Sequence, residues 1–212
     1  MKVTVIGGLG KMGGHIVQEL KANNIEVQII DKSNHTDTNA IDKDVNAVID
    51  ISHHSASVSV AKTCADKGLS LLIACTGHTK QEIEEINKFQ SKIPIEFCAN
   101  LSLGISFIMK GLDNLTMLGN HEVSIYECHH KYKKDSPSGT ALLLRNKIKQ
   151  TTDIDCEIVS SRIGDEFGTH IITLSLEHET ITIMHQAKSR KAFSTGAVKK
   201  LIKLAELSVN TK

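Results

Sequence analysis

The chain has 212 residues, 40% of them hydrophobic, and its 25 basic and 24 acidic side chains leave a formal net charge of +1. This length suits one large domain or two small ones, and the apolar content is enough for a sizeable buried core. The balanced charge argues against nucleic acid or an anionic membrane as a bulk electrostatic partner, and an aromatic content of 3% argues against base-stacking surfaces.

Targeting segments and cysteine frameworks are also not indicated. No apolar run approaches the roughly 18 residues of a membrane span, and the first residues follow a strand pattern, not a signal-peptide layout. The cysteines are odd in number, widely spaced and contain no CxxC pair, which argues against a zinc ribbon or a disulfide framework. We therefore expect free thiols in a reducing cytoplasm, and no metal. The five cysteines are Cys64, Cys75, Cys98, Cys128 and Cys156.

The first hundred residues alternate strand and helix patterns. Short apolar runs rich in β-branched residues predict buried strands. These strands are expected at 3–8, 25–31, 45–52, 69–75 and 93–100, with helices at 11–22, 57–68 and 79–89. The polar residues 33–44 are expected to form a connection and not a third full βα unit. Alternation in this order predicts a parallel, doubly wound sheet.

The pattern changes to strand-rich α+β near residue 100. We predict helices at 102–112 and 137–150, a strand at 121–128, and antiparallel strands at 156–164, 170–178 and 179–187. The chain closes with an amphipathic helix from Gly196 to Leu207. This helix has no sheet partner of its own. The predicted domains are therefore residues 1–100, to which the helix within 192–212 returns, and residues 101–191.

A glycine-rich turn, GGLGKMG, follows the first strand and leads into a helix. Gly7, Gly10 and Gly13 are spaced as a stretched dinucleotide fingerprint, in which pyrophosphate lies on the free N–H groups of the helix N-terminus. The acidic residue expected about 20 positions later is Asp31, at the end of the second strand. Asp31 can accept a hydrogen bond from the ribose of NADH and would repel the 2′-phosphate of NADPH, whereas Lys32 would attract that phosphate. The sequence therefore predicts a nicotinamide dinucleotide, either NADH or NADPH.

Two further strand ends, in ACTGHT and CANLS, place small polar residues where ligands gather in such sheets. Ordinary strand-to-helix turns explain them equally well.

The segment ECHHKYKKDSPSGTA, residues 127–141, lies between a strand and a helix. Asp135 or Ser136 is expected to cap this helix, with Pro137 in its first turn. The N–H groups of residues 138–140 would then form a carboxylate or phosphate site at the positive end of the helix dipole, and Gly139 lets a ligand approach closely.

The same segment carries a set of proton carriers and positive charges. His129, His130 and Lys133 are interpreted as functional, because hydride transfer to a small anionic substrate needs an anion clamp and a proton donor. Lys131 and Lys134 are interpreted as solvated lysines.

This sequence resembles the dihydrodipicolinate reductase family over nearly its whole length. The family signature E-x-H-H-x-x-K-x-D-x-P-S-G-T-A is similar to residues 127–141, and GGLGKMG is similar to its glycine-rich start. ACTG and CANLS are similar to its G-T-T-G and A-x-N-x-S turns. SSRIGDEFGTH and AKSRKAFSTGA are similar to its later segments. The connection between Asp31 and Val45 is shorter than the family norm.

The resemblance implies a Rossmann-type cofactor domain and a mixed α+β domain that binds substrate and forms a homotetramer. It implies that His129 is the proton donor and acceptor, that Lys133 is the second proton donor, and that the substrate carboxylates bind His130, Gly139 and Thr140. The implied contacts of NADH or NADPH are Gly7, Gly8, Leu9, Gly10, Lys11, Met12, Asp31, Lys32, Ala74, Cys75, Thr76, Cys98, Ala99, Asn100 and Leu101.

The implied reaction is reduction of 4-hydroxy-tetrahydrodipicolinate, a cyclic imine dicarboxylate, to tetrahydrodipicolinate in lysine biosynthesis through diaminopimelate. An amino-acid dehydrogenase of similar architecture would act instead on an amino acid. A dinucleotide sensor would keep the glycine loop without a proton donor, so His129 and Lys133 weigh against it. The alternating strands at 170–187 would expose an apolar sheet face in a monomer, which predicts pairing across subunits.

Overall fold

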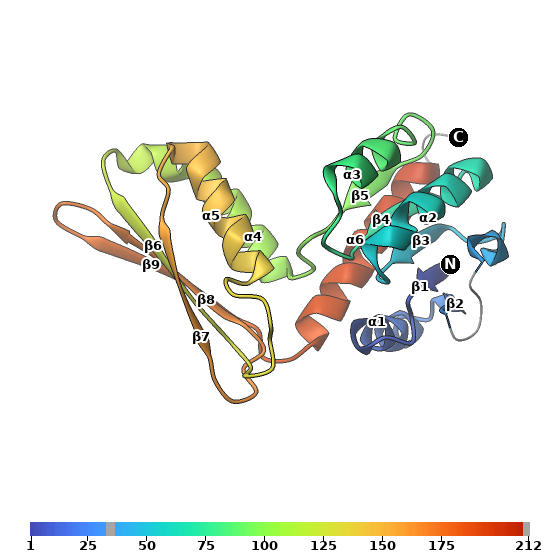
Figure 1. Ribbon diagram of the computed structural model, residues 1–212, viewed down its shortest axis with the longest axis horizontal. Helices are drawn as coiled ribbons and strands as arrows, with labels where there is room; N and C mark the ends of the chain where they lie inside the picture. The colour runs from blue at the N-terminus through green and yellow to red at the C-terminus, as the bar shows by residue number, and fades with distance from the viewer. Residues whose placement is uncertain (33–36, 210–212) are drawn as a thin grey trace. The chain divides into compact units, whose positions relative to one another are not determined.

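The computed structural model describes residues 1–32 and 37–209, which form two compact units (Figure 1). Unit 1 holds the chain up to Leu101 and again from Phe193, and unit 2 holds the chain from Ser102 to Ala192. The chain therefore passes between the units twice. No described helix is both long and apolar enough to cross a bilayer.

Unit 1 is built on a five-stranded parallel sheet in the order β2-β1-β3-β4-β5. Every residue of β3 and β4 is buried, as expected of strands covered on both faces. The strands are β1 (Lys2–Ile6), β2 (Glu26–Ile30), β3 (Ala47–Asp50), β4 (Ser70–Ile73) and β5 (Ile95–Phe97). The predicted parallel, doubly wound sheet is confirmed.

Helices cover both faces of this sheet (Figure 1). One core cluster joins the sheet to α1 (Lys11–Ala22) and α6 (Lys191–Val209). The other joins it to α2 (His54–Lys67) and α3 (Lys80–Asn87). The predicted start of the last helix at Gly196 is wrong by five residues, because this buried glycine lies inside α6.

The connection from β2 to β3 is short. Its described part, from residue 37, contains the 3₁₀ helix η1 (Thr38–Ala40), which Asp37 caps through the N–H of Asn39. Residues 33–36 of the predicted connection lie outside the described residues. In the described part, no full βα unit forms here, as predicted.

Unit 2 is a four-stranded sheet in the order β7-β6-β8-β9, covered on one face by helices (Figure 1). Its strands are β6 (Glu122–His129), β7 (Glu157–Arg162), β8 (Thr169–Ser175) and β9 (Thr180–Gln186), and its helices are α4 (Leu103–Gly111), η2 (Leu112–Leu118) and α5 (Gly139–Thr152). β8 and β9 form the predicted antiparallel hairpin. The antiparallel prediction for β7 is wrong, because β7 pairs parallel to β6. The helix α5 connects the two strands, and such a crossover returns the chain in the same direction.

The register of this sheet sorts its side chains into rows on opposite faces. Ile125 pairs with Ile158 and Ile172, and this row packs under the helices. The next row, on the other face, joins Val159, Tyr126, Ile171 and Met184 across all four strands. The row that follows Tyr126 along β6 lies again on the helix-covered face, and its side chains are polar.

Candidate active site

The glycine-rich turn of unit 1 is closely packed against neighbouring backbone. Gly7 has φ +82°, and a Cβ atom there would lie 2.8 Å from the Cα of Ser52. A Cβ atom at Gly13 would lie 2.1 Å from the carbonyl oxygen of Gly7. Only glycine fits either position, so the loop keeps its backbone close to the N-terminus of α1.

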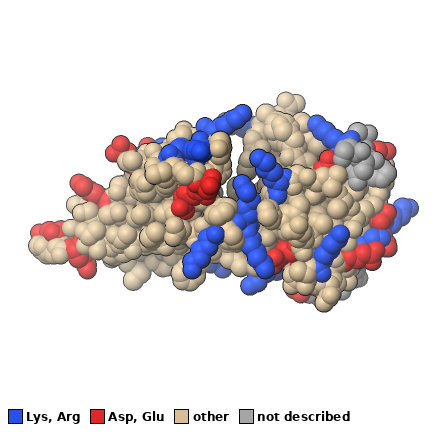
Figure 2. Space-filling view, turned by 90° about the horizontal axis from the view of Figure 1, so that it is seen from below, with Lys and Arg blue, Asp and Glu red and all other residues tan. Residues whose placement is uncertain are grey.

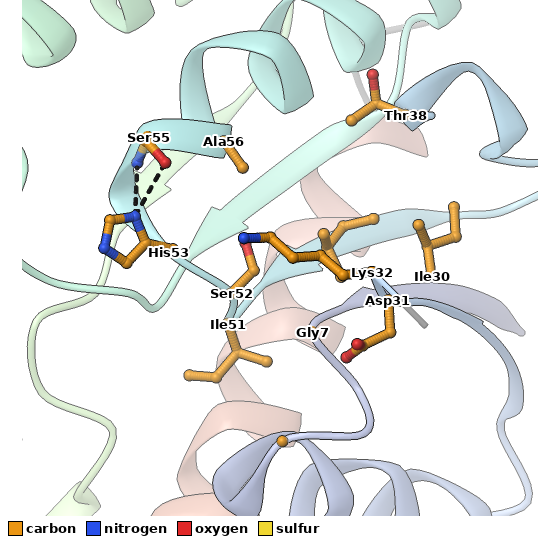
Figure 3. Close-up of a pocket in the computed structure, with 12 residues that line it drawn as sticks. Gly7, Ile30, Asp31, Lys32, Thr38, Ile51, Ser52, His53, Ser55 and Ala56 are labelled. Carbon is orange, nitrogen blue, oxygen red and sulfur yellow. Dashed lines mark hydrogen bonds between the residues drawn. The ribbon is translucent and has the colours of Figure 1, made fainter. Parts of the chain in front are cut away.

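A cavity of about 450 Å³ opens beside this loop (Figure 3). Gly7, Gly10, Asp31 and Lys32 line it, and the Asp31 carboxylate accepts a hydrogen bond from the N–H of Leu9 over 3.3 Å. In Figure 3 the Lys32 side chain extends toward Ser52. The cavity thus combines a glycine loop at a helix N-terminus with an acidic residue at the next strand end, which is the combination that fits a dinucleotide.

Four polar residues that also line this cavity were not predicted from the sequence: Thr38, Ser52, His53 and Ser55. The last three follow β3, and His53 caps α2, with its Nδ1 atom 2.9 Å from the Ser55 hydroxyl. The rule that ligands bind outside the carboxyl ends of parallel strands applies to β3 as it does to β4 and β5. Applied to β3, it would have indicated this segment.

The remaining predicted cofactor residues do not line this cavity. Gly8, Leu9, Lys11 and Met12 belong to the glycine loop and the first turn of α1. Ala74, Cys75 and Thr76 follow β4, and Cys98, Ala99, Asn100 and Leu101 follow β5.

Several of these side chains are buried in the unit 1 core. Ala74, Cys98 and Leu101 belong to the core cluster under α1 and α6, so a ligand would meet their backbone. Burial and the nearby Asp50 charge raise the pKa of the Cys75 thiol to about 12, which keeps it protonated.

In unit 2, His129 ends β6, and the residues after it form a turn. The Lys133 ammonium group pairs with the Asp135 carboxylate over 2.8 Å. Lys131 and Lys134 are exposed, in accord with their interpretation as solvated residues. Among the described residues, the Nδ1 atom of His130 is buried without a hydrogen-bond partner.

The predicted cap of α5 is wrong. The helix begins at Gly139, and Ser138 caps it by accepting a hydrogen bond from the N–H of Ala141. Pro137 precedes the cap, and neither Asp135 nor Ser136 occupies the capping position. The N–H of Ser138 donates to Glu127, so it is not available to an external anion. The first-turn N–H of Thr140 and the open space around Gly139 remain at the positive end of the dipole.

Glu127, a residue not predicted as part of the site, lies at the centre of the polar cluster. Its side chain is fully buried, Oε2 lies 2.5 Å from the Nδ1 atom of His129, and Oε1 lies 2.9 Å from Arg162. Burial by itself would raise the pKa of Glu127, but hydrogen bonds, that of Arg162 foremost, outweigh it and lower this pKa. Burial lowers the pKa of His129, and Glu127 opposes that shift.

Two more histidines extend this cluster across the sheet, and neither was predicted as part of the site. His170 pairs in register with Glu127, and His185 pairs with His170. Burial, with the charges of His129 and His185, lowers the pKa of His170 to about 4. His170 lies 3.3 Å from the Ser138 hydroxyl, and His185 lies 3.0 Å from the hydroxyl of Ser102, which caps α4.

The fold, the cavity beside the glycine loop of unit 1 and the polar cluster around Glu127 in unit 2 together define a class of protein. It is an NAD(P)H-dependent oxidoreductase with a Rossmann-type domain. Two family models match nearly the whole chain: "Dihydrodipicolinate reductase, N-terminus" over residues 1–101 and "Dihydrodipicolinate reductase, C-terminus" over residues 104–210. The chain belongs to the dihydrodipicolinate reductase family.

Individual relatives agree with this assignment. The 4-hydroxy-tetrahydrodipicolinate reductase of Clostridium novyi is 34% identical, with 93% of this chain and 90% of the relative covered. That of Thermosipho africanus is 32% identical, with 94% and 89% covered.

Solved structures show the same fold. The dipicolinate-bound dihydrodipicolinate reductase from Paenisporosarcina sp. TG-14 matches with a TM-score of 0.82 at 18% identity, over 97% of this chain and 95% of that one. Aspartate dehydrogenase from Thermotoga maritima matches with a TM-score of 0.58 at 13% identity, over 96% of each chain. The fold is therefore shared with an amino-acid dehydrogenase, and the residues of the site have to distinguish the two activities.

Proposed function

We propose that this protein reduces 4-hydroxy-tetrahydrodipicolinate to tetrahydrodipicolinate with NADH or NADPH. The observation that carries the proposal is the segment 127–141, which brings a buried histidine, a lysine and a helix N-terminus into one short stretch of unit 2. Relatives that bear the name of this reductase align over more than nine-tenths of the chain.

In this reaction the bound dinucleotide supplies the hydride. The N-terminus of α5 at Gly139 and Thr140, together with His130 and Lys133, binds the two substrate carboxylates. Lys133 would exchange its pairing with Asp135 for a pairing with substrate. These positive groups also stabilise the negative charge that develops in the substrate. Loss of the 4-hydroxyl group as water gives a conjugated cyclic imine, which takes up the hydride at C4, and His129 then delivers a proton to the adjacent carbon, C3.

The test is an assay on freshly generated 4-hydroxy-tetrahydrodipicolinate with each cofactor. We expect NADH and NADPH to be consumed only when this substrate is present, and no reduction of either oxidised cofactor by amino acids. Amino-acid oxidation without turnover of the dicarboxylate would identify an amino-acid dehydrogenase and contradict the proposal.

Cofactor choice gives a second prediction. The Asp31 carboxylate lies in the cavity wall and would repel a 2′-phosphate, and Lys32 partly offsets it, so both cofactors should work, with NADH equal or better. Asp31→Ala should shift the ratio of kcat/KM values toward NADPH by roughly tenfold, the effect of removing about 1.4 kcal/mol of repulsion. Lys32→Ala is the matched control and should shift the ratio the other way. A wild-type enzyme that strongly prefers NADPH would refute this interpretation.

A homotetramer is the third part of the proposal. The row Val159, Tyr126, Ile171 and Met184 lies on the sheet face that the helices leave uncovered, and Met184 is 57% exposed. Figure 2 shows that unit 2 carries few charges over much of the surface in view. An apolar face of this kind is typical of an interface between subunits.

Assembly can be tested through this face. Met184→Lys should dissociate the tetramer, because it introduces a charge into the apolar row. Met117→Lys in η2 is the control, since Met117 is 81% exposed and lies outside the sheet. Light scattering at micromolar concentration measures the mass of each variant. A monomeric wild type would contradict the assembly proposal.

Because the cofactor site lies in unit 1 and the proton carriers lie in unit 2, we also propose that the units close over the ligands during turnover. The hinges would lie near Asn100–Leu101 and near Lys191–Ala192, next to the two places where the chain passes between the units. The five free thiols support a reducing cytoplasm as the location of the protein.

A further inference from the structure

The polar cluster of unit 2 contains more than the proton-carrying histidine. Glu127 and His129 are two residues apart on β6, so their side chains lie on the same face, in line with the core residues Val123 and Ile125. A carboxylate at this core position is fully buried, and its pairing with Arg162 of β7 offsets the cost of burying its charge.

We infer that Glu127 is a positioning residue, which holds the imidazole of His129 as the Nδ1–H tautomer and so directs Nε2 toward the substrate. This inference rests on the proposed role of His129 in proton transfer. The Glu127 carboxylate can only accept hydrogen bonds, so at 2.5 Å from Nδ1 it requires a proton on that nitrogen. In the neutral ring the lone pair is then on Nε2, and in the imidazolium the second proton is on Nε2.

The other carboxylate oxygen is held in place independently of His129. Oε1 of Glu127 accepts hydrogen bonds from the Arg162 guanidinium over 2.9 Å and from the N–H of Ser138 over 3.3 Å. On the opposite side of the ring, Gly168 packs so closely that a Cβ atom there would lie 2.9 Å from Nε2. The ring is therefore held between Glu127 and Gly168, with its tautomer determined by Glu127.

Burial lowers the pKa of His129, and the charged groups that face the ring add to this shift or oppose it. Glu127 favours the imidazolium, whereas Lys133 and Arg162 oppose it. His170 contacts the ring edge to face at 5.2 Å between centroids, and it stays neutral at pH 7. Glu127 is the one acidic group among these four, so its charge opposes the lowering of the His129 pKa.

The same residues could be mistaken for a metal site, because ligand atoms of Glu127, His129 and His170 lie within 4.8 Å of one another. Two ligands on one Zn²⁺ ion, each about 2.1 Å from it, would be held about 3.4 Å apart. The 2.5 Å separation of Oε2 and Nδ1 is that of a direct hydrogen bond. The guanidinium of Arg162 on the same carboxylate also opposes a cation.

Glu127→Gln tests the inference because the amide keeps the shape and loses the charge. Arg162 and the Ser138 N–H should hold the amide oxygen at the Oε1 position, which turns the NH₂ group toward His129. Nδ1 must then accept, so the ring should change to the Nε2–H tautomer. Glu122→Gln, an exposed change on the same strand, is the matched control.

The readout is the pair of ¹⁵N imidazole shifts of His129, assigned by their loss in His129→Gln and followed against pH. In the wild type we expect the Nδ1–H tautomer, and this measurement does not depend on the folding of any variant. In Glu127→Gln we expect the reversed tautomer, a titration moved to lower pH, and kcat at pH 7 reduced by roughly tenfold, part of the 10²-fold or more that acid–base help supplies.

Several results would overturn the inference. These are an Nε2–H tautomer in the wild type, an unchanged tautomer and titration in Glu127→Gln, or a shift of the His129 signals by one equivalent of Zn²⁺. Failure of the proposed function would appear differently, as full activity of His129→Gln. In that case the tautomer change in Glu127→Gln would still support the inference about Glu127.

Discussion

His129→Ala is expected to lower kcat by roughly 10²-fold or more, the usual scale of general acid–base help, with a modest change in substrate KM. The structure supports this separation, because His129 is held by Glu127 inside the sheet and not at the helix N-terminus that is proposed to bind carboxylates. Truncation would remove the proton carrier and leave the carboxylate site in place. Steady-state kinetics on the dicarboxylate substrate measures both constants.

Two lysines of the same turn provide the comparison. Lys133→Ala should lower kcat and also raise KM, because it removes an ion-paired ligand of the substrate. Lys134→Ala should be near wild type, because Lys134 is exposed. Dinucleotide affinity should survive in all three variants, since the predicted cofactor residues lie in unit 1. The assignment would be wrong if His129→Ala kept full kcat, or if Lys134→Ala were the variant that lost it.

The strands of unit 1 could be predicted because each depends on a local pattern. Val48, Ile49, Leu71 and Leu72 lie in short apolar runs, and a run buried on both faces has that composition wherever it pairs. The direction of β7 depends instead on a long-range choice. An isolated alternating strand carries no signal of its direction, and only its position after the crossover helix α5 makes it parallel to β6.

The candidate site was predictable where its chemistry is contained in one segment. His129 and Lys133 are close in sequence, whereas Arg162 and His170 of the same polar cluster come from other strands. Arg162 is 33 positions after His129, and His170 is opposite Glu127 only because of the antiparallel register of β6 and β8. The sequence contains one local signal for Glu127, which is its inward-facing position on an alternating strand. An acidic residue at such a position needs a buried partner.

The second large effect is expected at the glycine loop. Gly13→Ala should destabilise the protein and weaken dinucleotide binding, because the added Cβ atom would lie 2.1 Å from the carbonyl oxygen of Gly7 and 2.8 Å from the Cα of Gly8. Both contacts are with backbone, so the loop itself has to move. Overpacking of this kind costs about 1–3 kcal/mol, and for a chain of this size each kcal/mol lowers Tm by about 2–4 °C.

The adjacent residue offers a matched control. Gly14 is in the same turn of α1, but a Cβ atom there would come no closer than 4.0 Å to its nearest neighbour, the carbonyl oxygen of Gly8. Gly14→Ala should therefore be neutral, or stabilising by up to about 1 kcal/mol, because alanine is the better helix former. Thermal unfolding and NADH titration of both variants measure the difference. Equal Tm values and equal NADH affinities for Gly13→Ala and Gly14→Ala would show that close packing of the loop against the first turn of α1 does not determine the cofactor site.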